Sequence, residues 1–227
     1  MSQPDVSVVI AAHDEVATVA AVVAGCRQAL GVRLAEIIVV DDGSTDGTGL
    51  AAERAGAIVI RLSPNRGKGE ALRAGIGRSS GEWLVFLDAD GQDDPAEISV
   101  LLDAAIEGVA MVSGSRFLGT LGPGAISRPN LVGNLAFTAL FDVLYGARIT
   151  DSQAGFRAIR GSVARSLVLK SREYEIETEI LAQLLRSGLR VVEVPVTRSA
   201  RQAGTTDFRR VRNGLRILRS IVQGRLR

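Results

Sequence analysis

Two aspartates placed two residues apart are the strongest chemical candidates in this chain of 227 residues. Asp88 and Asp90 directly follow an apolar run, and Gln92 adds an amide oxygen close behind them. Hard oxygen ligands of this kind suit Mg²⁺ or Mn²⁺, and such an ion neutralises a departing diphosphate. Because Asp and Gly are also ordinary turn residues, a plain turn is the alternative reading of the same spacing.

Two further polar segments have the residue types that contact nucleotides. Residues 41–48 (DDGSTDGT) offer carboxylates that accept hydrogen bonds from a base or ribose, or that cap a helix. Residues 65–69 (NRGKG) place a cation and two glycines at the start of a predicted helix, which suits a phosphate or simply a turn. The segment matches neither a P-loop nor the glycine turn of dinucleotide-binding domains.

Strands and helices alternate through the first half of the chain and must position these groups. Short apolar runs predict strands over residues 6–12, 36–40, 57–62, 83–87 and 109–113. Apolar residues at helical spacing predict the intervening helices over residues 15–30, 45–55, 68–78 and 95–107. This order predicts an α/β fold with a Rossmann-like, mostly parallel sheet and helices on both faces. Ligands bind at the carboxyl ends of such strands. Three acidic clusters follow these strands, at residues 13–15 (HDE), 41–44 (DDGS) and 88–92 (DADGQ), and they should meet at one sheet edge.

The second half is less regular and ends in a basic segment. It predicts helices over 130–145, 176–186 and 208–226, and strands over 154–159 and 189–196. Residues 198–227 hold nine arginines and one acid, a charge of +8, which leaves −6 on the rest. We therefore divide the chain into a catalytic domain (1–200) and a basic amphipathic helix (201–227). The expected partner of the basic helix is an anionic membrane surface. The alternative is that the helix is exposed to solvent and binds no partner.

Composition excludes several classes of protein. One cysteine and one histidine exclude a disulfide framework and a Cys/His zinc site. Aromatic residues make up 4%, too few for a platform that stacks nucleic-acid bases, so no nucleic-acid partner is expected. The first residues have no cationic segment, and the run 6–12 is too short for a signal peptide. We expect a cytoplasmic protein that lies peripherally on the cytoplasmic face of the membrane.

Six segments in order resemble the motif set of family 2 glycosyltransferases with the GT-A fold. They are residues 11–15 (AAHDE), 41–48 (DDGSTDGT), 65–72 (NRGKGEAL), 88–92 (DADGQ), 114–116 (GSR) and 151–157 (DSQAGFR). Within that family the chain is most similar to polyprenyl or dolichyl phosphate mannosyl- and glucosyltransferases. The resemblance implies an inverting transfer of a hexose from a nucleotide sugar, GDP-mannose or a UDP-sugar, to a polyprenyl phosphate. It leaves open whether the enzyme is a homo-oligomer.

The resemblance also implies roles for individual residues. The nucleotide would contact Ala11, His13, Glu15, Asp42, Lys68, Asp88 and Ala89. The metal would be held by Asp90 and Gln92, and the catalytic group would be Asp88, Asp90, Arg116 and Asp151. Phosphate groups of the donor or acceptor would be bound by Arg116, Arg128, Arg198 and Arg201.

The chain departs from the family pattern at two places, and the second bears on the acceptor. Ala11 and Asp14 replace the usual Pro and Asn of the first motif, and residues 204–207 (GTTD) lack the lysine usual in the late loop. A phosphate acceptor is already ionised and needs cations rather than a strong base. An alcohol acceptor would need a carboxylate base, from Asp151 or the glutamates of 173–177. Two alternatives therefore remain. One is a soluble family 2 glycosyltransferase with an alcohol or small phosphorylated acceptor, and the other is a non-catalytic module that binds a nucleotide sugar.

Overall fold

The computed structural model describes residues 5–203 and 210–226, and within them one mixed sheet carries the fold. Its strands are β1 (Val6–Ala12), β2 (Leu34–Asp41), β3 (Ile58–Arg61), β4 (Trp83–Asp88), β5 (Val109–Leu121), β6 (Arg157–Arg160) and β7 (Arg190–Arg198). They lie in the order β3-β2-β1-β4-β6-β5-β7. Only β6 runs antiparallel to its neighbours β4 and β5 within this sheet. The predicted α/β fold with a mostly parallel sheet is confirmed.

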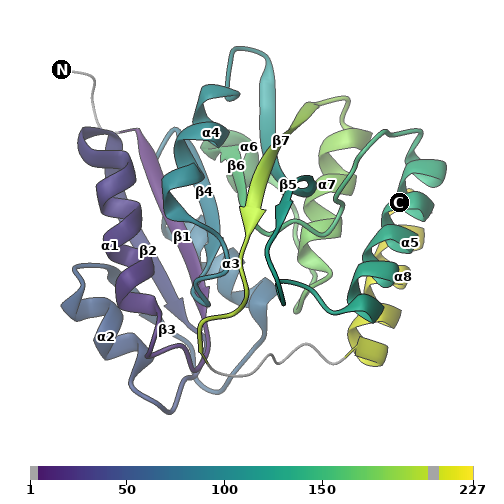
Figure 1. The fold of residues 1–227 in the computed structure, drawn as a ribbon. Coiled ribbons are helices and arrows are strands. Elements are labelled where there is room, and N and C mark those ends of the chain that lie inside the picture. Colours follow the sequence, from purple (N-terminus) through teal and green to yellow (C-terminus); the bar gives the residue numbers. More distant parts are fainter. Residues whose placement is uncertain (1–4, 204–209, 227) are drawn as a thin grey trace.

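Helices cover both faces of the sheet (Figure 1). They are α1 (Val19–Leu30), α2 (Thr48–Arg54), α3 (Lys68–Arg78), α4 (Ile98–Asp103), α5 (Arg128–Tyr145), α6 (Gly161–Ser166), α7 (Ile176–Arg186) and α8 (Arg210–Leu226), with short 3₁₀ turns η1 (Gly31–Arg33) and η2 (Pro95–Glu97). Alternate residues of β1 face opposite cores, as strand geometry requires. Val8 and Ile10 pack in the cluster of α1 and α4, whereas Val9 packs with α3 and α7.

Several predicted boundaries shift for identifiable reasons. The helix predicted from residue 15 begins at Val19, because residues 15–18 form a turn in which the Glu15 carbonyl accepts from Val19 N–H. The strand predicted to end at residue 113 continues to Leu121, because β7 pairs with it as far as Arg198. Helix α6 was not predicted. Its six residues are too few to show a helical period.

The C-terminal helix presents a different face to the core from the one that the sequence predicts. Ile217 and Ile221 are 2% and 0% exposed, and they join the apolar cluster formed by α5 and α7. Most of the predicted apolar stripe faces outward instead, with Val211 79% and Leu215 62% exposed. Residue 208 of that stripe lies outside the described residues. Among residues 5–203 and 210–226 no helix is long and apolar enough to cross a bilayer.

Candidate active site

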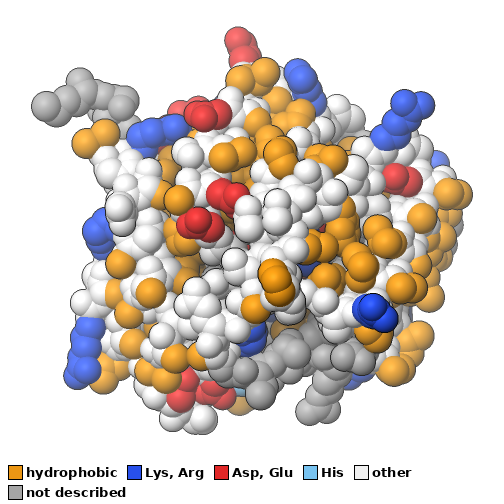
Figure 2. Space-filling view, in the orientation of Figure 1, with side chains coloured by type: hydrophobic (Ala, Val, Ile, Leu, Met, Phe, Trp, Pro, Cys, Tyr) orange, Lys and Arg blue, Asp and Glu red, His pale blue; other side chains and the backbone are white. Residues whose placement is uncertain are grey.

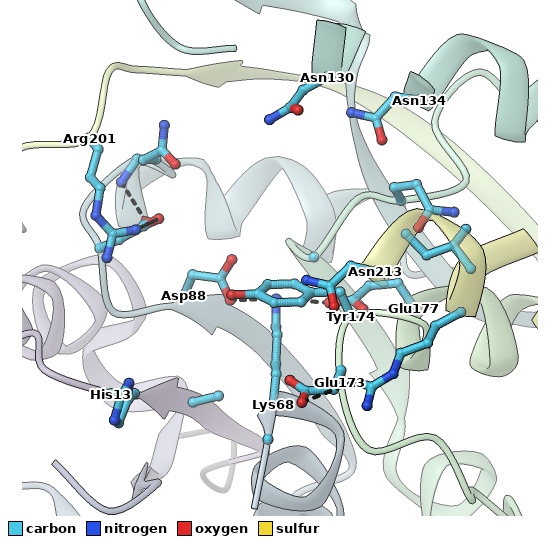
Figure 3. Close-up of a pocket in the computed structure, with 18 of the residues that line it drawn as sticks. His13, Lys68, Asp88, Asn130, Asn134, Glu173, Tyr174, Glu177, Arg201 and Asn213 are labelled. Atoms are coloured by element: carbon cyan, nitrogen blue, oxygen red, sulfur yellow. Dashed lines mark hydrogen bonds and ion pairs between the residues drawn. The ribbon is translucent and has the colours of Figure 1, made fainter. Parts of the chain in front are cut away.

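A cavity of about 1320 Å³ opens at the carboxyl ends of β1 and β4, beside the loop that follows β2 (Figure 3). The parallel register places Ala11 beside Asp88 and Ala12 beside Asp41, so loops distant in sequence share this edge. Most of the predicted site residues line the cavity: Ala11, His13, Glu15, Asp42, Lys68, Asp88, Ala89, Asp90, Gln92, Arg116, Arg198 and Arg201. The predicted convergence of the three acidic clusters is confirmed, whereas the individual roles stay predictions.

Asp42 shapes the turn that begins α3. Its two carboxylate oxygens accept hydrogen bonds from the backbone N–H groups of Arg66 and Gly67, each at 2.7 Å. Gly67 has φ +96°, and a Cβ there would lie 2.2 Å from the carbonyl oxygen of Arg172, so only glycine fits. Burial raises the pKa of Asp42, although the two N–H donors oppose the rise. The carboxylate that was predicted to contact the nucleoside therefore also holds the NRGKG turn in place.

Lys68, the first residue of α3, bridges two carboxylates. Its Nζ lies 2.7 Å from Asp88 Oδ1 and 2.8 Å from Glu177 Oε1, and the Tyr174 ring centroid is 5.7 Å away. Burial alone would lower the pKa of Lys68, but the charges of Asp88 and Glu177 raise it above its ordinary value. The same ion pair, acting against burial, lowers the pKa of Asp88. Lys68 and Asp88 therefore stay charged at neutral pH.

Two arginines approach Asp90: Arg198, the last residue of β7, and Arg201, which follows that strand. Arg201 donates from Nη1 to Asp90 Oδ2 at 3.1 Å and also pairs with Glu15. Arg198 lies 3.8 Å from the same oxygen. Burial, and then the charge of nearby Asp88, raises the pKa of Asp90. Burial raises the pKa of Glu15 to about 7, a rise that Arg201 partly offsets. Glu15, Asp88 and Asp90 form an acidic corner of the cavity, and two arginines place positive charge beside it.

The donor set of this corner suits a hard divalent cation. Asp90 is buried and Asp88 half-buried, and Asp88 is close enough for its charge to raise the pKa of Asp90. Together they offer the carboxylate oxygens that such an ion prefers. Gln92 is turned differently: its Oε1 accepts from Arg198 at 2.9 Å, and its Nε2 donates to the Ser199 carbonyl at 2.9 Å. The two carboxylates suit the ion chemically, but Asp88 already pairs with Lys68 at 2.7 Å and Asp90 with Arg201 at 3.1 Å, so an ion would compete with these cations. Gln92 would have to exchange the Arg198 contact for the ion.

Arg116 is held by a buried carboxylate. Asp151 accepts from Arg116 Nε at 2.6 Å and from Nη2 at 2.7 Å, a bidentate pair, and the Asp151 side chain is 0% exposed. The backbone N–H of Asp151 in turn donates to Glu193 at 3.0 Å. Arg116 lines the cavity, but Asp151 does not. Asp151 therefore orients Arg116 and does not itself face the cavity, and the catalytic role predicted for Asp151 stays a prediction.

Arg128 does not lie where the prediction placed it. It is the first residue of α5, is exposed and does not line the cavity.

Several residues that line the cavity were not predicted from the sequence. They include Asn130, Asn134, Tyr174, Glu177 and Asn213. The glutamate cluster over 173–177 was weighed only as an alternative base. The asparagines come from α5 and α8, whose approach to the cavity only the tertiary structure reveals.

Comparison with known proteins identifies the family. The family model described as "Glycosyl transferase family 2" matches residues 7–168, which hold the described sheet edge and most of its acidic corner. The chain belongs to glycosyltransferase family 2. The predicted family and an enzymatic, glycosyl-transferring function are thereby confirmed.

Two curated relatives illustrate how far this family 2 glycosyltransferase resembles others. Glycosyltransferase AglJ of Haloferax volcanii is 32% identical over 217 residues, covering 94% of this chain and 70% of that protein. Polyprenol monophosphomannose synthase of Mycolicibacterium smegmatis is 34% identical over 188 residues, covering 76% and 69%.

A solved structure confirms the fold of this family 2 glycosyltransferase. Glucosyl-3-phosphoglycerate synthase from Mycobacterium tuberculosis superposes with a TM-score of 0.78 at 23% identity, covering 97% of this chain and 80% of that one. The GT-A fold expected from the motif order is thus confirmed.

Proposed function

We propose that this glycosyltransferase transfers a hexose, with inversion, from a nucleotide sugar to a polyprenyl phosphate at a membrane surface, with Mg²⁺ or Mn²⁺ as cofactor. Two kinds of observation support the proposal. The cavity combines acidic and arginine side chains suited to a diphosphate, and its outer wall is formed by helices that are apolar on the surface. The name of the polyprenol monophosphomannose synthase relative agrees with a polyprenyl phosphate acceptor.

The chemistry that the cavity residues supply is mainly positive charge. Transfer to a phosphate brings an anionic nucleophile towards an anionic donor, so their repulsion must be screened. Three arginines line the cavity and provide guanidinium groups for this: Arg116, which Asp151 holds, Arg198 at the end of β7, and Arg201. A divalent cation held by Asp88 and Asp90 would neutralise the leaving diphosphate. Because phosphate is already ionised at neutral pH, no carboxylate base is needed.

The exposed faces of α5 and α8 are the observation that carries the lipid acceptor. The two helices pack side by side, and both contribute to the cavity wall. Their outward aliphatic side chains are Val132, Leu135, Val143, Val211, Leu215, Leu218 and Val222, all between 38% and 81% exposed. Figure 2 shows hydrophobic side chains gathered over this side of the molecule. We call these seven residues the α5–α8 apolar face.

Charge around the apolar face fits an anionic leaflet. Arg212 and Arg219 of α8 and Arg128 of α5 are exposed, and α8 has no acidic residue. Aliphatic side chains flanked by arginines are the composition with which amphipathic helices lie on anionic bilayers. A peripheral position of this kind would bring the cavity close to lipid phosphate groups without any spanning helix.

A partition assay tests the acceptor. Full-length protein is incubated with Mn²⁺ and radiolabelled UDP-glucose or GDP-mannose, with and without polyprenyl phosphate. We expect label in the butanol phase only when the lipid phosphate is present. Label on 3-phosphoglycerate or an alcohol, with none in butanol, would replace the proposal with a water-soluble acceptor. Release of no nucleoside diphosphate from any pair would indicate a binding module.

A matched variant links that assay to the acidic corner. Asp90→Ala should abolish metal-dependent transfer while the melting temperature stays near that of the unmodified protein. Asp94→Ala is the control, because Asp94 caps the short turn η2 at Ala96 N–H and does not line the cavity. Transfer that survives in Asp90→Ala would remove the metal role assigned to this carboxylate.

A further inference from the structure

Asn213 is a buried amide with nothing in the described protein to bind. It is 4% exposed, lines the cavity, and its side chain makes no hydrogen bond with any other residue in 5–203 and 210–226. Enclosed side-chain atoms without a partner occur at five other described residues but not at Asn213, so its amide is reached from the cavity. A polar group in such a place normally meets a partner, here whatever occupies the cavity. The cavity is the only surface that Asn213 lines here, which points to a ligand as its partner.

The position of Asn213 on α8 makes its burial unusual. Asn213, Ile217 and Ile221 are spaced four residues apart and form one buried stripe along the helix. The other two members of the stripe are aliphatic and pack into the core, whereas the member that reaches the cavity is an amide. An aliphatic residue at 213 would serve the packing of α8 better, so packing does not account for the asparagine.

Two more asparagines face the same cavity from α5. Asn130 and Asn134 lie one helical turn apart, both line the cavity, and neither side-chain amide has a partner among the described residues. The helices meet at this level, because a Cβ added to Gly214 would lie 3.5 Å from the Phe137 ring. We call Asn130, Asn134 and Asn213 the amide wall. Figure 3 shows it on the side of the cavity away from Arg201.

The chemistry of the amide wall selects the kind of ligand. An amide is neutral and offers both a donor and an acceptor, which matches a hydroxyl group. Phosphate oxygens would instead be matched by guanidinium groups, and those stand across the cavity at Arg116, Arg198 and Arg201. In Figure 3 Asn213 points toward the centre of the cavity, where Asp88 and Tyr174 also lie. Arg212 and Arg216 of α8 also line the cavity, but both lie against Glu173, at 3.8 Å and 3.0 Å. The three amides have no such partner among the described residues and stay available to a ligand that carries hydroxyl groups.

We infer that the amide wall binds the hydroxyl groups of the donor hexose and that Asn213 is a specificity-determining residue for that sugar. The inference rests on the proposed use of a nucleotide sugar and does not depend on which acceptor is used. It gives α8 a second role, because the helix completes the hexose subsite as well as forming the apolar face. Affinity for the sugar should therefore depend on α8 even when no membrane is present.

Asn213→Leu is the decisive variant, because it removes the amide and keeps the number and branching of the side-chain heavy atoms. Binding of UDP, UDP-glucose, GDP and GDP-mannose is measured by calorimetry with Mn²⁺ and no acceptor. We expect Asn213→Leu to weaken binding of the preferred nucleotide sugar about tenfold, or about 1.4 kcal/mol, and to change binding of the matching diphosphate less than twofold. Its melting temperature should equal or exceed that of the unmodified protein, since a leucine suits the buried stripe.

Gln223→Leu is the matched control. Gln223 carries the same amide on the same helix, but it is exposed and does not line the cavity. It should leave both affinities unchanged. Asn134→Ala, at a half-buried position, supplies a second variant should Asn213→Leu fold poorly, and it should show the same selective loss.

Three results would overturn the inference. The first is an equal loss of affinity for diphosphate and nucleotide sugar, which would indicate a general structural defect. The second is unchanged affinity for both ligands in both variants. The third is an unmodified protein that binds every nucleotide sugar no more tightly than its diphosphate. Failure of the lipid acceptor in the partition assay leaves all three readouts intact, so the two proposals fail separately.

Single-hydroxyl analogues give an independent readout. A nucleotide sugar that lacks the hydroxyl bound by Asn213 should bind the unmodified protein more weakly than the parent sugar. It should bind Asn213→Leu as well as the parent sugar does, because the contact is already lost. If the affinity lost by removing a hydroxyl and the affinity lost in Asn213→Leu add up at every hydroxyl position, Asn213 does not contact the sugar.

Discussion

Arg201 and Asp90 are 111 residues apart in sequence, yet Arg201 Nη1 lies 3.1 Å from Asp90 Oδ2. The guanidinium occupies the side of the carboxylate that a metal ion would use. Arg201 also pairs with Glu15, so one side chain from the segment after β7 connects two of the acidic clusters. Metal binding and this ion pair should therefore compete.

Arg201→Ala should strengthen binding of Mn²⁺ in the absence of donor. The substitution removes a cation that both occupies Asp90 and repels the ion, so we expect a dissociation constant lower by roughly three- to tenfold. Transfer should nevertheless fall, because a phosphate-binding cation is lost. Titration of Mn²⁺ followed by electron paramagnetic resonance measures the affinity. Arg61→Ala, which breaks only the exposed pair with Glu53, is the control. Equal affinities in all three proteins would show that Arg201 does not compete with the metal.

Asp151→Asn should impair turnover through Arg116. The carboxylate holds the guanidinium by two hydrogen bonds, and an amide can accept only one of them. We expect kcat to fall on the order of 10²-fold, with the donor affinity nearly unchanged. Steady-state kinetics together with donor titration measure the two quantities. Arg116→Lys, which keeps the charge and loses the fork, should cause a similar fall. A kcat within twofold of the unmodified enzyme in Asp151→Asn would rule out the positioning role.

The raised pKa of Glu15 predicts how stability depends on pH. Burial raises this pKa from its ordinary value of 4.5 to about 7, so between these values the folded chain binds a proton that the unfolded chain has lost. The contribution of Glu15 is therefore fully present below pH 4.5 and is lost as the pH rises through about 7. The loss amounts to at most roughly 3 kcal/mol. Urea unfolding in metal-free buffer at several pH values measures it.

Glu15→Gln provides the comparison for that measurement. Because glutamine does not titrate, the free energy of unfolding of this variant should fall less between pH 5 and pH 7.5 than that of the unmodified protein. Identical pH profiles for the two proteins would show that Glu15 titrates alike in the folded and unfolded chains.

Leu215→Glu should weaken binding to anionic liposomes by about tenfold or more, because it removes an apolar side chain from the α5–α8 apolar face and adds a charge that anionic lipids repel. Leu215 is 62% exposed, so the fold should survive. Deletion of α8 would be a poorer test, since it would also remove the buried Ile217 and Ile221. Val32→Glu, at a 75% exposed site in the turn η1 that directly follows α1, is the control. In Figure 1 helix α1 lies at the opposite side of the molecule from α5 and α8. Liposome sedimentation at low and high salt measures binding, and equal sedimentation of both variants would argue against the α5–α8 apolar face.

The sequence alone determined the fold class and most of the cavity lining. Buried parallel strands are short apolar runs, and their carboxyl ends share one edge whatever the details of packing. Residues 11–15, 41–48 and 88–92 could therefore be placed together from their positions after such runs. Their ordered motifs were specific enough to indicate the family. The sequence shows directly which side chains follow each strand. Because parallel strands end at the same edge of the sheet, it also predicts that these side chains lie close together.

Only the tertiary structure decided which side chains touch and which face of each helix is buried. The pairing of Arg201 with Asp90, of Lys68 with Glu177 and of Arg116 with Asp151 depends on how segments far apart in sequence approach each other. On α8 both faces carry aliphatic residues, so periodicity could not show that Ile217 and Ile221 pack inward. The amide wall was unpredictable for the same reason. An asparagine on a helix is ordinary in sequence, and it becomes informative only when packing buries it without a partner.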